Sequence, residues 1–419
     1  MYKDYFLTTI ITFFCLNISH GQSYKLKDIE TLFLQNNYSL LAKKFEISQS
    51  EAFLLQEKLL PNPTLTVDEV NLWKNSSSEQ LPYLFGRYGK TQQVSVAIEQ
   101  LIETAGKRKK RVAIKQSEVK QTSFEYEELL RELKRELRLS YWNLYKINQA
   151  QKQTETLLEL YSQLHEQYNR QAKLQNVSQV DTYRIQTALI NLQSENTELL
   201  QEQAQLLLSL QQLTQIPNLQ LQQIEFPSPT FNLSEKLPID LIEKLQQNNI
   251  ALKQLENQLQ IAHQQLVLEE AQKIPDLKLQ VSYDRGGNIM RDFVGVGVNI
   301  DIPVFNKNKG NINAAKNTID IKKNDQKALE NQIKTEANLA VNQILYFESL
   351  LKQRNDFLQI NGPQLLKNFH KHLNSKQITL LEFIDFTQAH LEAEKAYNKW
   401  MFDYYTNYEQ LQFLLGKDF

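Results

Sequence analysis

Two carboxylates near the end of the chain, Glu382 and Asp385, are three residues apart. On a helix this spacing brings both side chains to one face, where they could present paired negative charge to a cation. An acidic helix face that only meets solvent has the same pattern. The chemistry of the pair therefore depends on the elements that position it.

The other reactive side chains form no catalytic pattern. His370 and His372 are two residues apart, and helical side chains at that spacing diverge instead of sharing a ligand. The basic run 107–111 is compatible with lipid headgroups, with a pore lining or with a solvated helix start. Because no nucleophile motif, phosphate-binding loop or metal-ligand spacing is present, we expect no enzymatic activity, no cofactor and no bound metal.

The composition favours long helices. The 419 residues include only 11 Gly and 10 Pro, and Gln, Leu, Glu and Lys fill long stretches. This is typical of amphipathic helices rather than of compact globular packing. The 47 basic and 48 acidic residues leave a formal net charge of -1, so the charge balance favours no nucleic-acid partner.

Residues 1–21 are predicted to be a signal peptide. A basic residue precedes an apolar run at 5–16, and small residues follow at the positions that signal peptidase reads. Acylation at Cys15 is the alternative, although the residue before it is bulkier than a lipoprotein signal requires. No other uninterrupted apolar run approaches the roughly 20 residues that a membrane-spanning helix needs. The protein is therefore expected to be exported.

One order of elements occurs twice along the chain. Each copy has a helical stretch that ends at proline, two strands with alternating apolar residues, a long helix and a return helix. We predict a first repeat at 22–214, a linker at 215–238 and a second repeat at 239–419. In the first repeat we expect a helix from about 25 to 60, a hairpin at about 64–99, a helix at 107–173 and a return helix up to 213. In the second repeat we expect a helix at 240–273, a hairpin at about 276–303, a helix at 312–373 and a return helix at 379–415.

The long helices have a coiled-coil pattern. The stretch 107–173 contains no Pro or Gly, and at about 1.5 Å per residue it would be about 100 Å long. Its apolar residues recur at alternating spacings of three and four, which predicts a packed seam. In the second copy Gly362 and Pro363 interrupt the pattern and predict a kink. The hairpin loops are expected at 73–88 and 284–292.

Four amphipathic strands cannot close a barrel by themselves, because the smallest single-chain outer-membrane barrels have about 8 strands. An open sheet in lipid would leave backbone groups unpaired at both edges. A membrane location therefore requires several copies, and three would supply twelve strands. The alternative is a soluble α+β protein whose hairpins pack on their own helices.

The ordered pairs of motifs resemble those of the TolC-like outer-membrane efflux proteins, over essentially the whole chain after the signal peptide. The run 60–65, Leu-Pro-Asn-Pro-Thr-Leu, looks like the family's entry into its first strand. The run 302–305, Ile-Pro-Val-Phe, followed by Gly310, looks like its exit from the fourth. Residues 99–103, together with 106–108 and Arg111, are similar to the heavy-metal cation branch, the cobalt-zinc-cadmium and copper-silver systems.

This resemblance implies a mainly α fold with a membrane β-barrel part. Each protomer would contribute four β-strands and a long α-helical coiled-coil tunnel, and a homotrimer would form a twelve-stranded barrel. The implied location is the outer membrane of a Gram-negative bacterium, with strands in lipid and helices in the periplasm. A periplasmic adaptor and an inner-membrane transporter are the implied partners.

The resemblance also assigns roles to the two helix-to-helix turns and to the acidic pair. The turns match the periplasmic tips that meet the adaptor, where the family often has Gly and this chain has none. Glu382 and Asp385 match the pair at the tunnel's constricted aperture, where threefold symmetry would give a ring of six carboxylates and a preference for cations. Their first-copy counterparts, Asp181 and Arg184, are expected to form a local or interprotomer ion pair. The expected adaptor-docking residues are Gln175, Asn176, Val177, Ser178, Ser375, Lys376, Gln377, Ile378 and Thr379.

The expected function is that of a passive exit duct for small solutes or heavy-metal cations, the outer-membrane channel of an RND-type tripartite efflux pump. Two alternatives stay open at this point. One is the exit channel of a type I protein secretion system, and the other is a soluble periplasmic coiled-coil scaffold or adaptor. An adaptor would normally carry one helical hairpin and a lipoyl-like β-domain, whereas this chain has two helical hairpins and two β-hairpins.

Overall fold

The computed structural model describes residues 23–68, 70, 83, 93–286, 290–358 and 362–419. The predicted signal peptide and most of the first hairpin loop lie outside these residues. The chain divides into two compact units that cut across the sequence repeats, so the repeat boundaries at 214 and 239 stay a prediction. The sheet unit comprises Tyr38–Arg135, Leu233–Tyr346 and Asn407–Phe419, and the turn unit comprises the chain up to Asn37, Glu136–Asn232 and Phe347–Thr406.

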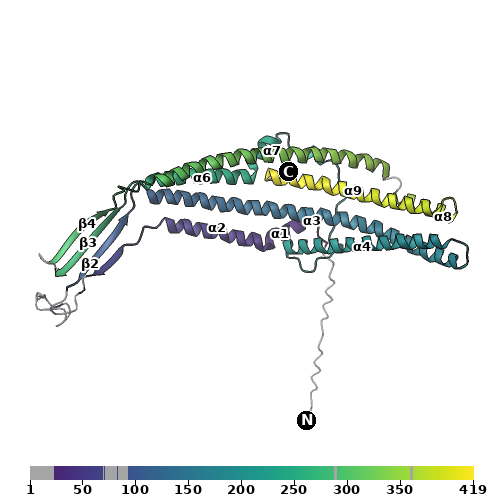
Figure 1. Cartoon of the computed structure of the whole chain (residues 1–419), viewed down its shortest axis with the longest axis horizontal. Helices are drawn as coiled ribbons and strands as arrows, with labels where there is room; N and C mark the ends of the chain where they lie inside the picture. The colour runs from purple at the N-terminus through teal and green to yellow at the C-terminus, as the bar shows by residue number, and fades with distance from the viewer. Residues whose placement is uncertain (1–22, 69, 71–82, 84–92, 287–289, 359–361) are drawn as a thin grey trace, which may run out of the picture. The chain divides into compact units, whose positions relative to one another are not determined.

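The sheet unit contains an antiparallel sheet with the strand order β1-β2-β3-β4 (Figure 1). The two predicted hairpins join through β2 and β3, where Ile98 lies opposite Val281. The second hairpin is longer than expected, because Asp284 pairs with Phe293 and continues the alternation of the strand. The ends of the loop predicted at 284–292 are therefore strand. The strands are Thr64–Asp68, Ser95–Ile102, Leu277–Gly286 and Arg291–Ile300.

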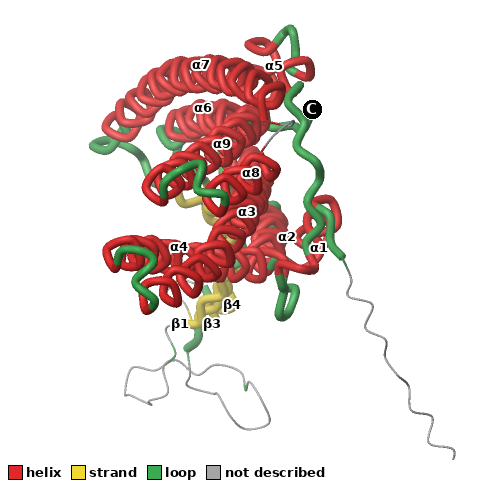
Figure 2. Tube along the Cα trace, turned by 90° about the vertical axis from the view of Figure 1, so that its right-hand side faces the viewer, coloured by secondary structure: helices red, strands yellow, loops and turns green. Residues whose placement is uncertain are grey.

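Helices connect to both ends of each hairpin. The helix α2, Tyr38–Glu57, leads into β1, and α6, Ile250–Ala271, leads into β3. The strand β2 is followed by α3, Lys107–Lys173, and β4 by α7, Lys309–Leu358. The helices α6 and α7 lie side by side in Figures 1 and 2. The side-chain amide of Asn308 joins them by donating to a Glu269 carboxylate oxygen at 2.6 Å.

Ion pairs fix the start of α3. The Lys107 ammonium, on a side chain that is almost fully buried, lies 2.8 Å from Asp276 Oδ1. The Arg111 guanidinium donates two hydrogen bonds to Glu103, of 2.6 and 2.8 Å, and one to Glu57 of 2.6 Å. These carboxylates, Glu103 first, raise the pKa of Arg111 above its ordinary value. Two members of the basic run therefore hold the strands to the helices and are not a free cationic surface.

A buried asparagine interrupts the first helix of each copy, which the sequence pattern did not reveal. Asn37 separates α1, Leu26–Asn36, from α2, and Asn249 separates α5, Leu241–Asn248, from α6. Their side-chain amides donate to the carbonyl oxygens of Leu213 and Leu414, at 3.0 and 2.8 Å. Those carbonyls belong to the last turns of helices, where intrahelical donors are lacking. Each helix expected at 25–60 and 240–273 is therefore two helices.

The turn unit is built on two helical hairpins (Figure 2). The second half of α3 pairs with α4, Gln179–Thr214, and α8, Gly362–Asn374, pairs with α9, Leu380–Leu415. The bounds of α3 are those predicted, and its seam residues Leu137, Leu144 and Ile147 are at most 1% exposed. The helix expected at 312–373 is instead α7 and α8, and the residues between them lie outside the described chain. Proline in the first turn of α8 is compatible with a helix start.

The predicted linker packs closely on the turn unit. Ile224 forms a parallel bridge with Tyr24. The Phe226 ring lies 5.2 Å from the Tyr141 ring, measured between centroids, and the Tyr141 hydroxyl donates to the carbonyl oxygen of Glu225 at 2.8 Å. The segment forms only two short 3-10 helices, Leu221–Gln223 and Leu233–Lys236, and the aromatic contacts help to order it.

Replacing Asn249 by leucine should destabilise the protein by about 2–3 kcal/mol. The change removes a helix cap, in which Asn249 Oδ1 accepts from the Leu252 amide at 2.9 Å, and leaves the buried Leu414 carbonyl without its donor. Thermal or denaturant unfolding measures the loss. Asn317→Leu is the matched control, since Asn317 is exposed inside α7, and should shift stability by no more than about 0.5 kcal/mol. Equal losses in the two variants would contradict the role given to Asn249.

Candidate functional site

The sheet has one apolar face that is exposed. The register aligns Ile98, Val281 and Val296 in one row across three strands. Val296 is 88% exposed and Val294 is 68% exposed. A contiguous exposed apolar surface of this kind marks contact with lipid or with another protein. The face comprises Leu65, Val67, Val96, Ile98, Ile102, Leu277, Leu279, Val281, Tyr283, Val294, Val296, Val298 and Ile300.

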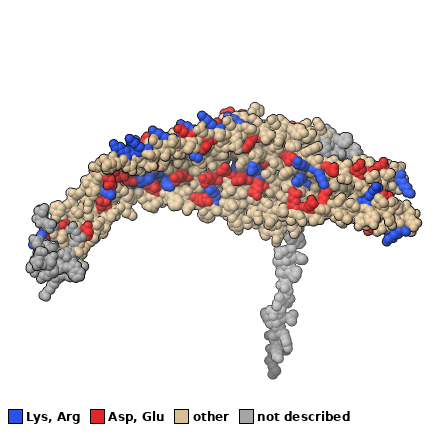
Figure 3. All heavy atoms as spheres, in the orientation of Figure 1, with Lys and Arg blue, Asp and Glu red and all other residues tan. Residues whose placement is uncertain are grey.

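The opposite face of the sheet is polar. The Asn299 side-chain amide lies within hydrogen-bonding distance of Glu99, at 3.3 Å, and of Gln280, at 3.5 Å. A Cβ at Gly295 on this face would approach the Phe293 ring to 2.8 Å, so a larger residue there would require that ring to shift. In Figure 3 the charged side chains lie mainly along the helices and are sparse on the described strands. The strands β1 and β4 each have one edge with no partner strand in the described chain.

The first helix-to-helix turn, between α3 and α4, is a Schellman turn without glycine. Gln175 has a φ of 59°, in the left-handed region. The Asn176 amide donates to the Gln171 carbonyl and the Gln175 amide to the Ala172 carbonyl, both at 3.0 Å. Ser178 then caps α4 by accepting from the Val180 amide at 3.1 Å. Val177 is half-buried between the two helices, and the other residues of the turn are exposed.

The second turn, between α8 and α9, repeats this geometry. Lys376 has a φ of 57°, and the Gln377 amide donates to the His372 carbonyl at 2.9 Å. Ile378 is half-buried like Val177, and Thr379 caps α9. Two segments of different sequence thus form the same exposed turn. All nine predicted docking residues lie in these turns or at the cap positions that follow them.

Glu382 belongs to the cap of α9. Its carboxylate accepts from the Thr379 amide at 2.7 Å and from the Thr379 hydroxyl at 2.8 Å. These hydrogen bonds lower the pKa of Glu382. Asp385 is exposed one turn further along. In the first turn the counterparts Asp181 and Arg184 form a local ion pair at 3.4 Å, one of the two arrangements expected from the sequence.

Polar contacts join α9 to the first hairpin of the turn unit. The hydroxyls of Tyr161 and Thr387 are 2.5 Å apart, and the Gln153 side-chain amide donates to Glu394 at 2.7 Å. These partners are 226 and 241 residues apart in the chain. Sequence reasoning missed them because no local pattern links positions so distant. Together with the apolar cluster that includes Leu157, Ile185 and Phe383, they hold the second hairpin against the first.

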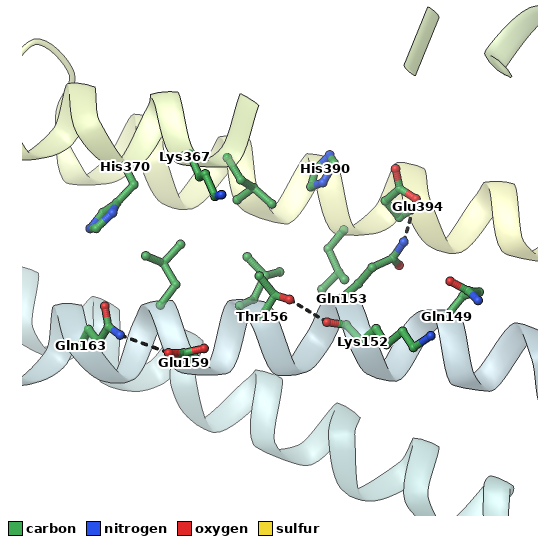
Figure 4. A pocket seen from close by; sticks show the side chains of 14 residues that line it. Gln149, Lys152, Gln153, Thr156, Glu159, Gln163, Lys367, His370, His390 and Glu394 are labelled. Atoms are coloured by element: carbon green, nitrogen blue, oxygen red, sulfur yellow. Dashed lines mark hydrogen bonds between the residues drawn. The ribbon is translucent and has the colours of Figure 1, made fainter. Parts of the chain in front are cut away.

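A groove of about 500 Å³ lies between α3 and the α8–α9 hairpin (Figure 4). Its walls include Leu157 and Leu391, with His370 and His390 at separate positions along the second hairpin. Within the described residues no three His, Cys, Asp or Glu side chains converge as metal ligands would. The groove is a polar-rimmed apolar surface.

Comparisons with known proteins agree with this architecture at the level of fold. No family model matches the chain, and no curated protein matches its sequence. The channel-forming protein CusC is 16% identical, with a TM-score of 0.74 over 94% of this chain and 92% of that one. The outer-membrane protein VceC of Vibrio cholerae is 15% identical, with a TM-score of 0.72 over 94% and 96%. The MtrE outer-membrane channel of Neisseria gonorrhoeae is 15% identical, with a TM-score of 0.70 over 94% and 89%.

The chain therefore has the TolC-like fold of these outer-membrane proteins, mainly α with a four-stranded sheet. Of these proteins, CusC forms a transmembrane channel and MtrE is an outer-membrane channel. Among the helices that the structure describes, none has the length and apolarity to cross a membrane.

Glu382 should stabilise the second turn in a pH-dependent way. Because its folded-state pKa is lowered, its contribution is complete above the 4.5 of an ordinary glutamate and is lost as the pH falls through the lowered value. The protection of the Thr379 amide against hydrogen exchange should therefore decrease on acidification. Glu382→Gln should remove this dependence, and Asp385→Asn, the matched control, should keep it. A wild-type pH response in the Glu382→Gln variant would refute the assignment.

Proposed function

We propose that the protein is the outer-membrane channel of an RND-type tripartite efflux pump, a passive exit duct for small solutes or heavy-metal cations. The exposed apolar face of a sheet with two unpaired edges carries this proposal. The fold shared with CusC, VceC and MtrE supports it. The resemblance of residues 99–111 to the heavy-metal branch supports metal cations as part of the cargo.

The sheet edges argue for three copies in one assembly. Backbone groups at an open edge have no hydrogen-bonding partner in lipid, and each unsatisfied group costs several kcal/mol. Pairing β4 of one copy with β1 of the next removes both edges. Three copies give twelve strands, with the apolar face toward lipid and the face with Glu99 and Asn299 toward water.

The two helix turns fit the role of docking sites for a periplasmic adaptor that connects the channel to an inner-membrane transporter. Their residues are exposed except for the half-buried Val177 and Ile378, and the turns share one backbone geometry while carrying different side chains. Gln175 and Lys376 occupy the left-handed position in which glycine is usual, so each turn presents a side chain at its end. A partner protein can contact these side chains and distinguish one turn from the other.

Arginine in place of Val296 should block insertion into the outer membrane. The substitution puts a charge at the centre of the apolar face, at a cost of about 2–4 kcal/mol per copy. Flotation of membranes on a density gradient, with immunodetection, measures the inserted fraction. Gln280→Arg is the matched control on the polar face and should insert like the wild type. The channel proposal fails if the wild-type protein is recovered in the soluble fraction, or if the two variants insert equally.

Neutralising the acidic pair should change ion flow through the channel. In Glu382→Gln/Asp385→Asn, a ring of six carboxylates would become neutral, so conductance should rise and cation selectivity should fall. Single-channel recordings in planar bilayers, with reversal potentials in a salt gradient, measure both. Glu235→Gln/Glu243→Gln removes the same charge from exposed positions in the sheet unit and should leave both quantities unchanged. An unaltered reversal potential in the Glu382→Gln/Asp385→Asn variant would contradict the assignment of the acidic pair to the aperture.

A further inference from the structure

A cationic pocket of about 750 Å³ lies where the strands meet the helices of the sheet unit. Its lining includes Lys58, just after α2, and Arg108 and Lys109 in the first turn of α3. Leu60 and Ile102 supply apolar walls. The pocket therefore combines three basic side chains with aliphatic surface.

The positive charge of this pocket is only partly offset by nearby acids, because Arg111 is shared between Glu103 and Glu57 and this group keeps one negative charge beside three cations. Glu103 also lines the pocket, but both of its carboxylate oxygens accept from Arg111. Arg108 makes one long hydrogen bond, of 3.3 Å, to the Lys58 carbonyl oxygen. The ammonium groups of Lys58 and Lys109 form no ion pair within the described residues, and both side chains are exposed. The pocket is thus built to receive an anion.

The pocket continues the apolar face of the sheet. Gln100 and Ile102, which line it, are in register with Leu279 and Leu277 of that face. Leu60, at its mouth, is 69% exposed. A ligand that fits both parts must have an anionic group for the three cations and hydrocarbon for the adjoining face.

We propose that this pocket binds the phosphate of an anionic phospholipid, whose acyl chains lie along the apolar face of the sheet. The inference rests on the proposed function, in which this end of the strands is level with the headgroups of the periplasmic leaflet. Basic pockets at the end of an apolar membrane surface attract anionic headgroups, since each cation near them contributes about fivefold to binding. Free phosphate would use the cations but leave Leu60 and Ile102 without a role.

Native mass spectrometry of the full-length assembled protein in detergent micelles tests this assignment. Phosphatidylglycerol, phosphatidylcholine and inorganic phosphate are titrated separately. The wild type should retain phosphatidylglycerol in clear preference to phosphatidylcholine. Lys58→Gln/Arg108→Gln/Lys109→Gln should lose this preference, with about a fivefold weakening for each cation removed.

Two further variants test whether the lipid preference depends on this pocket. Lys316→Gln/Lys323→Gln/Lys327→Gln removes three exposed lysines from α7 and should bind lipid like the wild type. Lys109→Glu alone changes an exposed side chain without altering the ion pairs at the start of α3, and should also abolish the preference. This single variant tests the proposal if Lys58→Gln/Arg108→Gln/Lys109→Gln does not assemble.

The outcomes separate this proposal from the channel function. If the protein inserts and conducts but the pocket variants, Lys58→Gln/Arg108→Gln/Lys109→Gln and Lys109→Glu, keep the phosphatidylglycerol preference, the lipid site is wrong and the channel stands. Inorganic phosphate binding with equal dependence on Lys109 and no lipid preference would also overturn the lipid assignment. Recovery of the wild type in the soluble fraction would contradict the channel function, and with it the lipid site that depends on that function.

Discussion

The exposed apolar face and the unpaired edges of the four-stranded sheet impose the main constraint on this protein. Apolar rows such as Ile98, Val281 and Val296 cannot remain in water without attracting other surfaces. The edges of β1 and β4 cannot remain in lipid without partners. An assembly that pairs the edges and covers the face with lipid, as in the proposed channel, satisfies both requirements at once. The helices then have to hold the sheet without covering that face, and the ion pairs of Lys107 and Arg111 provide this attachment from the strand ends.

Much of this fold could be predicted from the sequence because its signals are local and repeated. The bounds of α3 follow from the absence of Pro and Gly over 67 residues together with a regular seam. The strands follow from the alternation of apolar and polar residues, and their pairing follows from the order of two similar hairpins. Both helix turns were located because the apolar period stops there and resumes after a few polar residues.

The features that could not be predicted depend on contacts between distant residues. Asn37 and Asn249 look like ordinary polar positions in a helix, and their role appears only when the carbonyls of Leu213 and Leu414 lie beside them. The linker residue Phe226 becomes structural only against Tyr141. Likewise, the sequence could place Glu382 and Asp385 on one helix face. It could not distinguish their chemistries, because the engagement of Glu382 with Thr379 depends on the geometry of the turn.

In the proposed docking role, the two turns set folding stability against partner recognition at the same two positions. A side chain in the left-handed region costs on the order of 1 kcal/mol relative to glycine, so Gln175 and Lys376 hold the backbone under strain. Glycine would relieve that strain and at the same time delete a side chain from the exposed end of each hairpin. Substitutions selected only for higher thermal stability would therefore remove the side chains that distinguish the two turns. When more thermostable variants are selected in the laboratory, partner binding should be measured as well, because substitutions to glycine at these positions would remove exposed side chains.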